Sequence, residues 1–116
     1  MHISYISEPQ PDVALLKPRE DFYARTHPEP EDVLLIIEVA DSSLTYDRRA
    51  KMPFYATAGI PEFWLVDLTN QVVEVYARPS AGGYRESAVL GRGETVRARG
   101  IAGIALGVDD ILGQTQ

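Results

Sequence analysis

The segment 33–39, with the sequence VLLIIEV, constrains the fold more than any other part of this chain. A strand with one face in water alternates apolar and polar residues, whereas this run is apolar on both alternating faces. That pattern is typical of a central strand covered on both sides. Glu38 is the exception, and an unpaired carboxylate in such a strand would cost several kcal/mol to desolvate. The sequence therefore predicts a layered sheet and a partner that offsets the charge of Glu38.

Further strands are expected where apolar, β-branched and aromatic residues gather between turn formers. These segments are 13–16, 63–66, 72–76 and 84–90, with a last short strand at 104–106 before a helical turn at 108–112. Turn-forming residues at 68–70 and 79–83 separate neighbouring strands. This spacing predicts hairpins in the second half of the chain.

One main helix is expected over 45–58. Thr45 suits the N-cap, and Gly59 stands where a C-terminal stop is expected. Pro53 removes a hydrogen bond inside the segment, so we expect a kink there. Because most elements are strands, the chain is assigned to the α/β (α+β) class. We expect a single domain over 1–116, with a mixed central sheet and the main helix packed on it.

Composition excludes several classes of protein. The chain has no cysteine, which rules out disulfides and thiolate chemistry. His2 and His27 are the only histidines and are far apart in the sequence, so histidine-based catalysis is nearly excluded. No nucleophile elbow, Walker loop or dinucleotide fingerprint is present. The apolar runs are too short to span a bilayer and nothing resembles a signal peptide, so we expect a cytoplasmic protein that does not contact membranes.

The charge distribution argues against tight electrostatic binding of nucleic acid. The net charge is −6, and residues 1–45 carry nine acidic side chains against three basic ones. The remaining residues carry eight of each. The main basic side chains are expected to be solvated at the surface. They are Arg48, Arg49, Arg85, Arg92, Arg97 and Arg99.

The candidate chemistry rests on carboxylates beside apolar strands. Asp12 precedes the segment 13–16, Glu38 lies in the central run, and Asp47, Lys51 and Tyr55 stand four residues apart on one helical face. Two carboxylates that hold Mg²⁺ or Mn²⁺ beside a lysine form a minimal set for phosphodiester hydrolysis. Structural alternatives remain open: Glu38 could reach water or an arginine, Asp12 could be a turn residue, and Asp47 could pair with Lys51 at the surface.

Three blocks of residues follow one another in a specific order. They are Pro11-Asp12-Val13, then Ile37-Glu38-Val39-x-x-Ser42-Ser43, then Asp47-x-x-x-Lys51-x-x-x-Tyr55-x-x-x-Gly59-Ile60-Pro61-Glu62-x-Trp64-x-Val66-Asp67. This order resembles the Uma-two family of bacterial restriction endonucleases, within the restriction-endonuclease-like superfamily named for its PD-(D/E)XK motif. The resemblance runs from about Pro11 to the C-terminus. It implies a restriction-endonuclease-like fold, a DNA substrate and an Mg²⁺ or Mn²⁺ cofactor.

The resemblance also implies roles for individual residues. It makes Asp12 and Glu38 the metal-binding carboxylates. In the superfamily the motif lysine stands two residues after the second acid, where this chain has Ala40. Lys51 matches the family's own lysine, so the implied catalytic set is Asp12, Glu38 and Lys51.

The resemblance leaves the activity open between two functions. Family members usually carry a longer N-terminal section, and this chain has ten residues before Pro11. We therefore expect an N-terminally short member whose open sheet edge is covered by a second copy, as a homodimer. One possible function is an Mg²⁺-dependent endonuclease that hydrolyses DNA. The other is a catalytically inactive dimerisation or binding module that keeps the fold.

Overall fold

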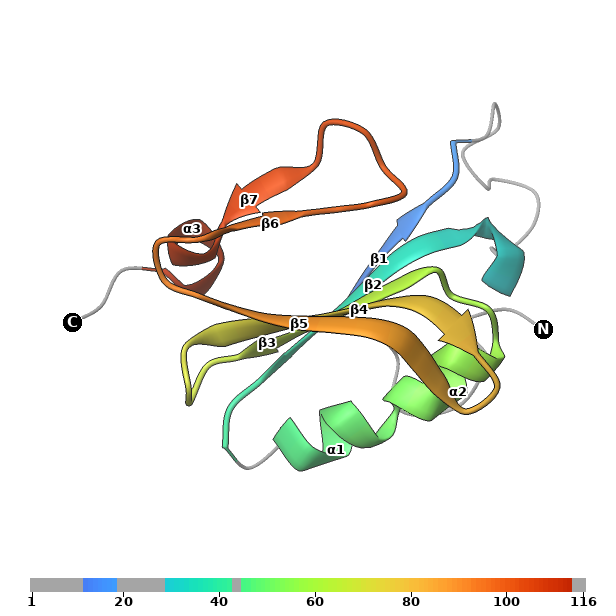
Figure 1. The fold of residues 1–116 in the computed structure, drawn as a ribbon, viewed down its shortest axis with the longest axis horizontal. Coiled ribbons are helices and arrows are strands. Elements are labelled where there is room, and N and C mark those ends of the chain that lie inside the picture. Colours follow the sequence, from blue (N-terminus) through green and yellow to red (C-terminus); the bar gives the residue numbers. More distant parts are fainter. Residues whose placement is uncertain (1–11, 19–28, 43–44, 114–116) are drawn as a thin grey trace.

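The computed structural model describes residues 12–18, 29–42 and 45–113. Their main feature is a five-stranded sheet in the order β1-β2-β3-β4-β5 (Figure 1). The strands are β1 (Val13–Leu16), β2 (Val33–Ala40), β3 (Glu62–Asp67), β4 (Val72–Ser80) and β5 (Gly83–Gly91). β2 and β3 run parallel, and the other neighbouring pairs run antiparallel. The predicted α/β class with a mixed central sheet is therefore confirmed.

A layer of other elements covers each face of this sheet (Figure 1). On one face, α1 (Thr45–Ala50) and α2 (Met52–Thr57) form the crossover that the parallel pair β2–β3 requires. On the other face lie β6 (Thr95–Arg97), β7 (Ala105–Gly107) and the short helix α3 (Val108–Leu112). A 3-10 helix, Pro30–Asp32, leads into β2. These two covers explain why the segment 33–39 is apolar on both faces.

Each face of the sheet carries its own hydrophobic core. On the face of α1 and α2, called the helix face below, the buried members are Val33, Ile36, Ala40, Tyr55, Ile60, Phe63 and Leu65. On the opposite face they are Leu35, Trp64, Val66, Val73, Val75, Val96 and Val108. Every residue of β3 is buried. Because full burial of one large apolar side chain contributes about 1.5–3 kcal/mol, the centre of the sheet supplies much of the driving force for folding.

The main helix is interrupted at Lys51, between α1 and α2. Pro53 lies in the first turn of α2, where a missing N–H is tolerated, but it cannot donate to a carbonyl of the preceding turn. The expected kink is therefore present, two residues before the proline. The helix ends as predicted at Gly59, whose φ of 83° lies in the left-handed region that glycine adopts without a steric penalty.

Three local predictions differ from the structure. Thr45 is the first residue of α1, and both its N–H and its hydroxyl donate to the carbonyl oxygen of Asp41, so Thr45 does not act as the expected N-cap. β4 and β5 keep pairing up to Ser80 and Gly83, which shortens the expected turn at 79–83. The strand β6 has no counterpart in the sequence prediction, because Val96 is its one buried residue.

The register of the sheet places two acidic residues in one row on the helix face. Glu38 of β2 lies beside Leu65 of β3, and Leu65 lies opposite Glu74 of β4. Both carboxylates are buried, and Leu65 between them belongs to the helix-face core. Buried carboxylates need cations or hydrogen-bond donors close by. The elements that cover this face must therefore supply them.

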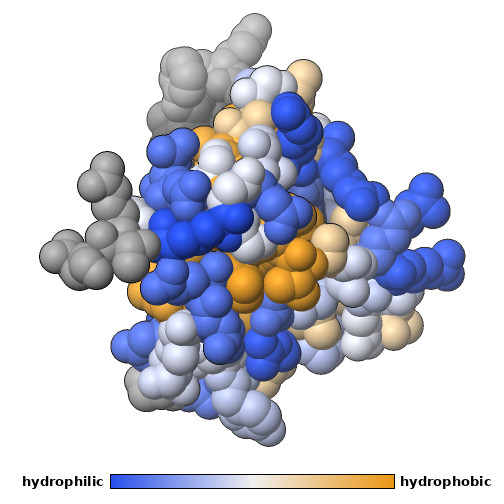
Figure 2. Space-filling view, turned by 60° about the vertical axis from the view of Figure 1, so that its left-hand side comes forward, coloured by the Kyte–Doolittle hydropathy of each residue, from blue (hydrophilic) through white to orange (hydrophobic). Residues whose placement is uncertain are grey.

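The described surface exposes large hydrophobic side chains from seven different segments. They are Val13, Val39, Tyr46, Phe54, Leu68, Val89 and Leu106. Figure 2 shows a small hydrophobic area enclosed by hydrophilic residues on the side that it turns toward the reader. Scattered exposure of this kind is normal on protein surfaces. Within the described ranges, no helix is long and apolar enough to cross a membrane.

Glu62, the first residue of β3, is a buried carboxylate with two hydrogen-bond donors. Trp64 Nε1 donates to its Oε2 at 2.7 Å, and the backbone N–H of Arg99 donates to its Oε1 at 2.9 Å. Glu62→Ala leaves both donors without this acceptor, so we expect the free energy of unfolding to fall by about 2–4 kcal/mol. Urea denaturation followed by Trp64 fluorescence measures the change. Glu31→Ala, at an exposed position, should change it by less than about 0.5 kcal/mol, and equal losses would contradict the role of Glu62.

Candidate active site

Glu38 is fully buried on the helix face, and one of its two oxygens is held by the main helix. The Tyr55 hydroxyl donates to Oε2 at 2.6 Å, and the Lys51 ammonium donates to the same oxygen at 3.2 Å. The Lys51 side chain therefore points toward Glu38, the direction expected if it is the family's lysine. Tyr55 and Lys51 reach the same atom because the Tyr55 N–H still donates to the Lys51 carbonyl across the break. The kink leaves their shared face intact.

The second oxygen of Glu38 faces Arg48 of α1. Arg48 Nε lies 3.4 Å from Glu38 Oε1, and its Nη2 lies 4.0 Å from Asp12 Oδ1. The same Nε contacts the carbonyl oxygen of Val39 at 3.5 Å. The Arg48 side chain is only 17% exposed, so its expected role as a solvated surface residue is wrong. One guanidinium group is thus surrounded by oxygens of three residues.

Asp12 is held at this place by the pairing of β1 with β2. Val13 lies opposite Ile37, so Asp12 precedes β1 at the level of Glu38, and the Val39 N–H donates to Asp12 Oδ2 at 2.7 Å. The Asp12 side chain remains 37% exposed. Asp12 and Glu38 therefore both lie within 4.0 Å of the Arg48 guanidinium. Their roles as catalytic or metal-binding residues, and that of Lys51, stay predictions.

The helix α1 is fixed to the sheet by charge, since none of its residues is buried. Arg48 contacts Glu38, and the next residue, Arg49, donates to both oxygens of Glu74 at 3.2 and 2.5 Å. The Tyr76 hydroxyl donates to Glu74 Oε1 at 2.6 Å. Two consecutive arginines thus bind the two carboxylates of one row across the sheet. This pairing sets the position of α1 above Glu38.

Two tyrosines act as hydrogen-bond donors to these carboxylates at any ordinary pH. Burial, together with the hydrogen bond to Glu38, holds the pKa of Tyr55 far above its usual value. Burial and the hydrogen bond to Glu74 raise the pKa of Tyr76 to about 12. Both phenols therefore stay protonated near neutral pH. In each case the hydroxyl proton is directed at the carboxylate and fixes its orientation.

The oxygens around Arg48 have the chemistry of a site for a hard divalent cation. Glu38 Oε1 is buried and accepts no hydrogen bond from the described groups. With Asp12 Oδ1 and the Val39 carbonyl, it gives the oxygen-only donor set that Mg²⁺ and Mn²⁺ favour. The described residues hold no cluster of three or more acidic or histidine side chains suited to a metal. Mg²⁺ needs fewer, because it is commonly held by one or two carboxylates and keeps several waters.

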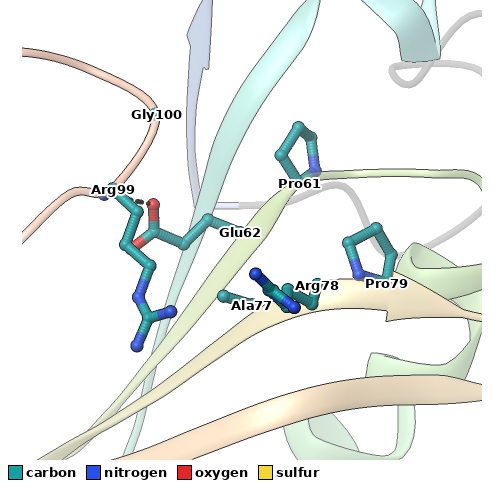
Figure 3. A pocket seen from close by; sticks show the side chains of 7 residues that line it. All are labelled: Pro61, Glu62, Ala77, Arg78, Pro79, Arg99 and Gly100. Carbon is teal, nitrogen blue, oxygen red and sulfur yellow. Dashed lines mark hydrogen bonds between the residues drawn. The ribbon is translucent and has the colours of Figure 1, made fainter.

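A separate pocket of about 390 Å³ lies at the start of β3 (Figure 3). Its lining residues are Pro61, Glu62, Ala77, Arg78, Pro79, Arg99 and Gly100. Glu62 accepts hydrogen bonds from Trp64 and Arg99, and both Arg78 and Arg99 form ion pairs with Glu86. The charged groups of this pocket are thus paired within the protein. Its buried carboxylate belongs to the face opposite the helices, so this pocket is separate from Glu38.

Several residues of the site have roles that the sequence does not reveal. Glu74 interrupts an apolar strand as Glu38 does, and that signal marks it as a buried carboxylate in need of a partner. Its partners, Arg49 and Tyr76, have no comparable signal in the sequence. Arg48 and Arg49 are adjacent in the sequence, and only the sheet register shows that each contacts a different carboxylate.

The fold and the site together define an α/β domain with an acidic, lysine-bearing site near the C-terminal end of β2. Uma2, a family described as "Putative restriction endonuclease", has a model that matches residues 2–109, so the chain belongs to the Uma2 family. This match confirms the resemblance to the Uma-two family that the sequence motifs indicate. A comparison with the curated proteins finds no match.

Proposed function

We propose that this chain is a metal-dependent endonuclease that hydrolyses DNA phosphodiester bonds with Mg²⁺ or Mn²⁺. The observation that carries the proposal is that the two oxygens of Glu38 have different partners. Its Oε2 is held by Lys51 and Tyr55, whereas its buried Oε1 faces a cationic position shared with Asp12. A structural ion pair requires neither the second carboxylate nor the lysine. The family description, restriction endonuclease, supports the same reaction class.

Each residue of the site has its own role in the proposed phosphodiester hydrolysis. A divalent ion bound by Asp12 and Glu38 would neutralise phosphate charge and lower the pKa of a bound water. The Lys51 ammonium stands beside the ion's carboxylate ligand, where it can donate a hydrogen bond to a phosphate oxygen as negative charge develops. Tyr55 holds Glu38 Oε2 and so fixes the direction in which Oε1 points.

The substrate assignment to DNA rests on the family rather than on surface charge. Five arginines of the described residues already contact carboxylates: Arg48, Arg49, Arg78, Arg92 and Arg99. Since few cations of the described residues remain without a carboxylate contact, we expect weak DNA binding that is sensitive to salt. The homodimer and the cytoplasmic location stay predictions.

Cleavage of supercoiled plasmid DNA tests the proposal. We expect the chain to nick the plasmid in the presence of Mn²⁺ or Mg²⁺ and to lose this activity in EDTA. Asp12→Asn should slow nicking about 100-fold, because it removes one negative charge from the ion's position and so weakens binding of the ion that the reaction needs. Asp110→Asn, an exposed acid of α3, should leave the rate unchanged.

Two outcomes would contradict this function. No nicking by the unaltered chain with either ion would favour the inactive binding module. Equal rates for Asp12→Asn and Asp110→Asn would remove Asp12 from the site, even if the chain cleaves DNA.

A further inference from the structure

Arg48 holds a position that is unusual for an arginine near a metal-binding pair. Its guanidinium lies among Asp12 Oδ1, Glu38 Oε1 and the Val39 carbonyl, at 4.0, 3.4 and 3.5 Å. These are the oxygens that would ligate a divalent ion. A divalent ion and the guanidinium cannot occupy this space together, because each would stand where the other is bound and like charges this close repel each other.

We infer that Arg48 is an internal cation that occupies the ion's position in the metal-free protein and leaves it when the ion binds. This inference rests on the proposed metal-dependent function. Without either cation, the carboxylates of Glu38 and Asp12, which both lie within 4.0 Å of Arg48, would have no positive charge at their shared position. Arg48 supplies that charge and stabilises the metal-free fold. The same contacts make it a direct competitor of Mg²⁺ or Mn²⁺.

The surroundings of Arg48 allow it to leave without unfolding the helix layer. Its side chain is 17% exposed, so the guanidinium has a short path to water. No residue of α1 is buried, but Arg49 still anchors this helix to Glu74. Tyr55 in α2 is buried in the helix-face core and holds the second half of the main helix. The departure of Arg48 therefore breaks its own contacts and spares those of its neighbours.

The position of Lys51 distinguishes it from Arg48. Lys51 contacts Glu38 Oε2, the oxygen that also accepts from Tyr55, whereas Arg48 contacts Oε1. Ion binding at Oε1 leaves this contact in place. Of the two cations at Glu38, one is thus displaced and one is retained, so their removal should affect Mn²⁺ binding differently.

Mn²⁺ binding to the metal-free protein, measured by isothermal titration calorimetry, tests the inference. Arg48→Met should bind Mn²⁺ at least about tenfold more tightly than the unaltered chain, because a positive charge within a few ångströms of the ion is lost. Arg85→Met is the control, since it removes the same charge from an exposed position of β5 that contacts neither α1 nor the ion's position. It should bind Mn²⁺ as the unaltered chain does. The double variant Arg48→Met/Glu38→Gln should lose the gain.

An independent measurement needs no variant that could fail to fold. In the unaltered chain, the Nε–H signal of Arg48 in an ¹⁵N NMR spectrum should shift when Mg²⁺ is added, as the guanidinium moves into water. The inference is overturned if Arg48→Met binds Mn²⁺ no more tightly than Arg85→Met, or if the Arg48 signal is unchanged at saturating Mg²⁺. Tight binding by Arg48→Met without DNA cleavage by any form supports the inference and contradicts the nuclease. DNA cleavage by the unaltered chain without tighter Mn²⁺ binding by Arg48→Met supports the nuclease and overturns the inference.

Discussion

Lys51→Met should lower kcat for DNA cleavage by about 100- to 1000-fold and leave the Kd for Mn²⁺ nearly unchanged. The ammonium contacts Glu38 Oε2, whereas the proposed ion position is at Oε1, so its removal does not take away an ion ligand. Methionine keeps the length and the apolar stem of the side chain. The main effect of the substitution is therefore the loss of a positive charge that would stabilise the transition state. Single-turnover cleavage of a plasmid gives the rate, and calorimetry gives the affinity.

The control for Lys51→Met is Arg85→Met, which removes one positive charge from an exposed position of β5. This variant separates a local effect at Glu38 from a general loss of attraction to DNA. Circular dichroism must show that both variants are folded. If Lys51→Met cleaves DNA as fast as Arg85→Met, the lysine is a structural partner of Glu38 and not a catalytic residue.

Glu38→Gln should weaken Mn²⁺ binding at least about 100-fold, because it removes a full negative charge from the ion's position. Glutamine has nearly the same volume and keeps a carbonyl oxygen as acceptor for the Tyr55 hydroxyl, so the buried packing of the site is retained. DNA cleavage should fall below detection. Calorimetric titration with Mn²⁺ measures the loss, and chemical denaturation measures the stability that remains.

Glu74 offers an unusually close control for this substitution. It lies in the same row of the sheet, is also buried, and is also bound by an arginine of α1 and by a tyrosine hydroxyl. Glu74→Gln therefore imposes the same chemical change on the same helix layer, but away from Asp12. We expect it to keep the Mn²⁺ affinity of the unaltered chain. Equal losses for both variants would show that the change acts through the stability of α1 and not through an ion ligand.

The sequence by itself determined the layered fold and the residue at the centre of the site. Burial on both faces requires apolar residues at every position, so the segment 33–39 could be identified as a central strand from its pattern alone. A carboxylate in such a strand is costly, which marked Glu38 before any partner was known. Helical spacing placed Lys51 and Tyr55 on one face, and both contact Glu38.

Only the tertiary structure decided which charges meet. The approach of Asp12 to Glu38 depends on the antiparallel register of β1 and β2, and that register joins residues separated by a long stretch of chain. The different partners of Arg48 and Arg49 depend on how α1 crosses the sheet. Periodicity records whether a side chain is buried, because burial repeats along a strand or helix. It does not record the partner of an ion pair, because that partner is set by contacts between elements distant in the sequence.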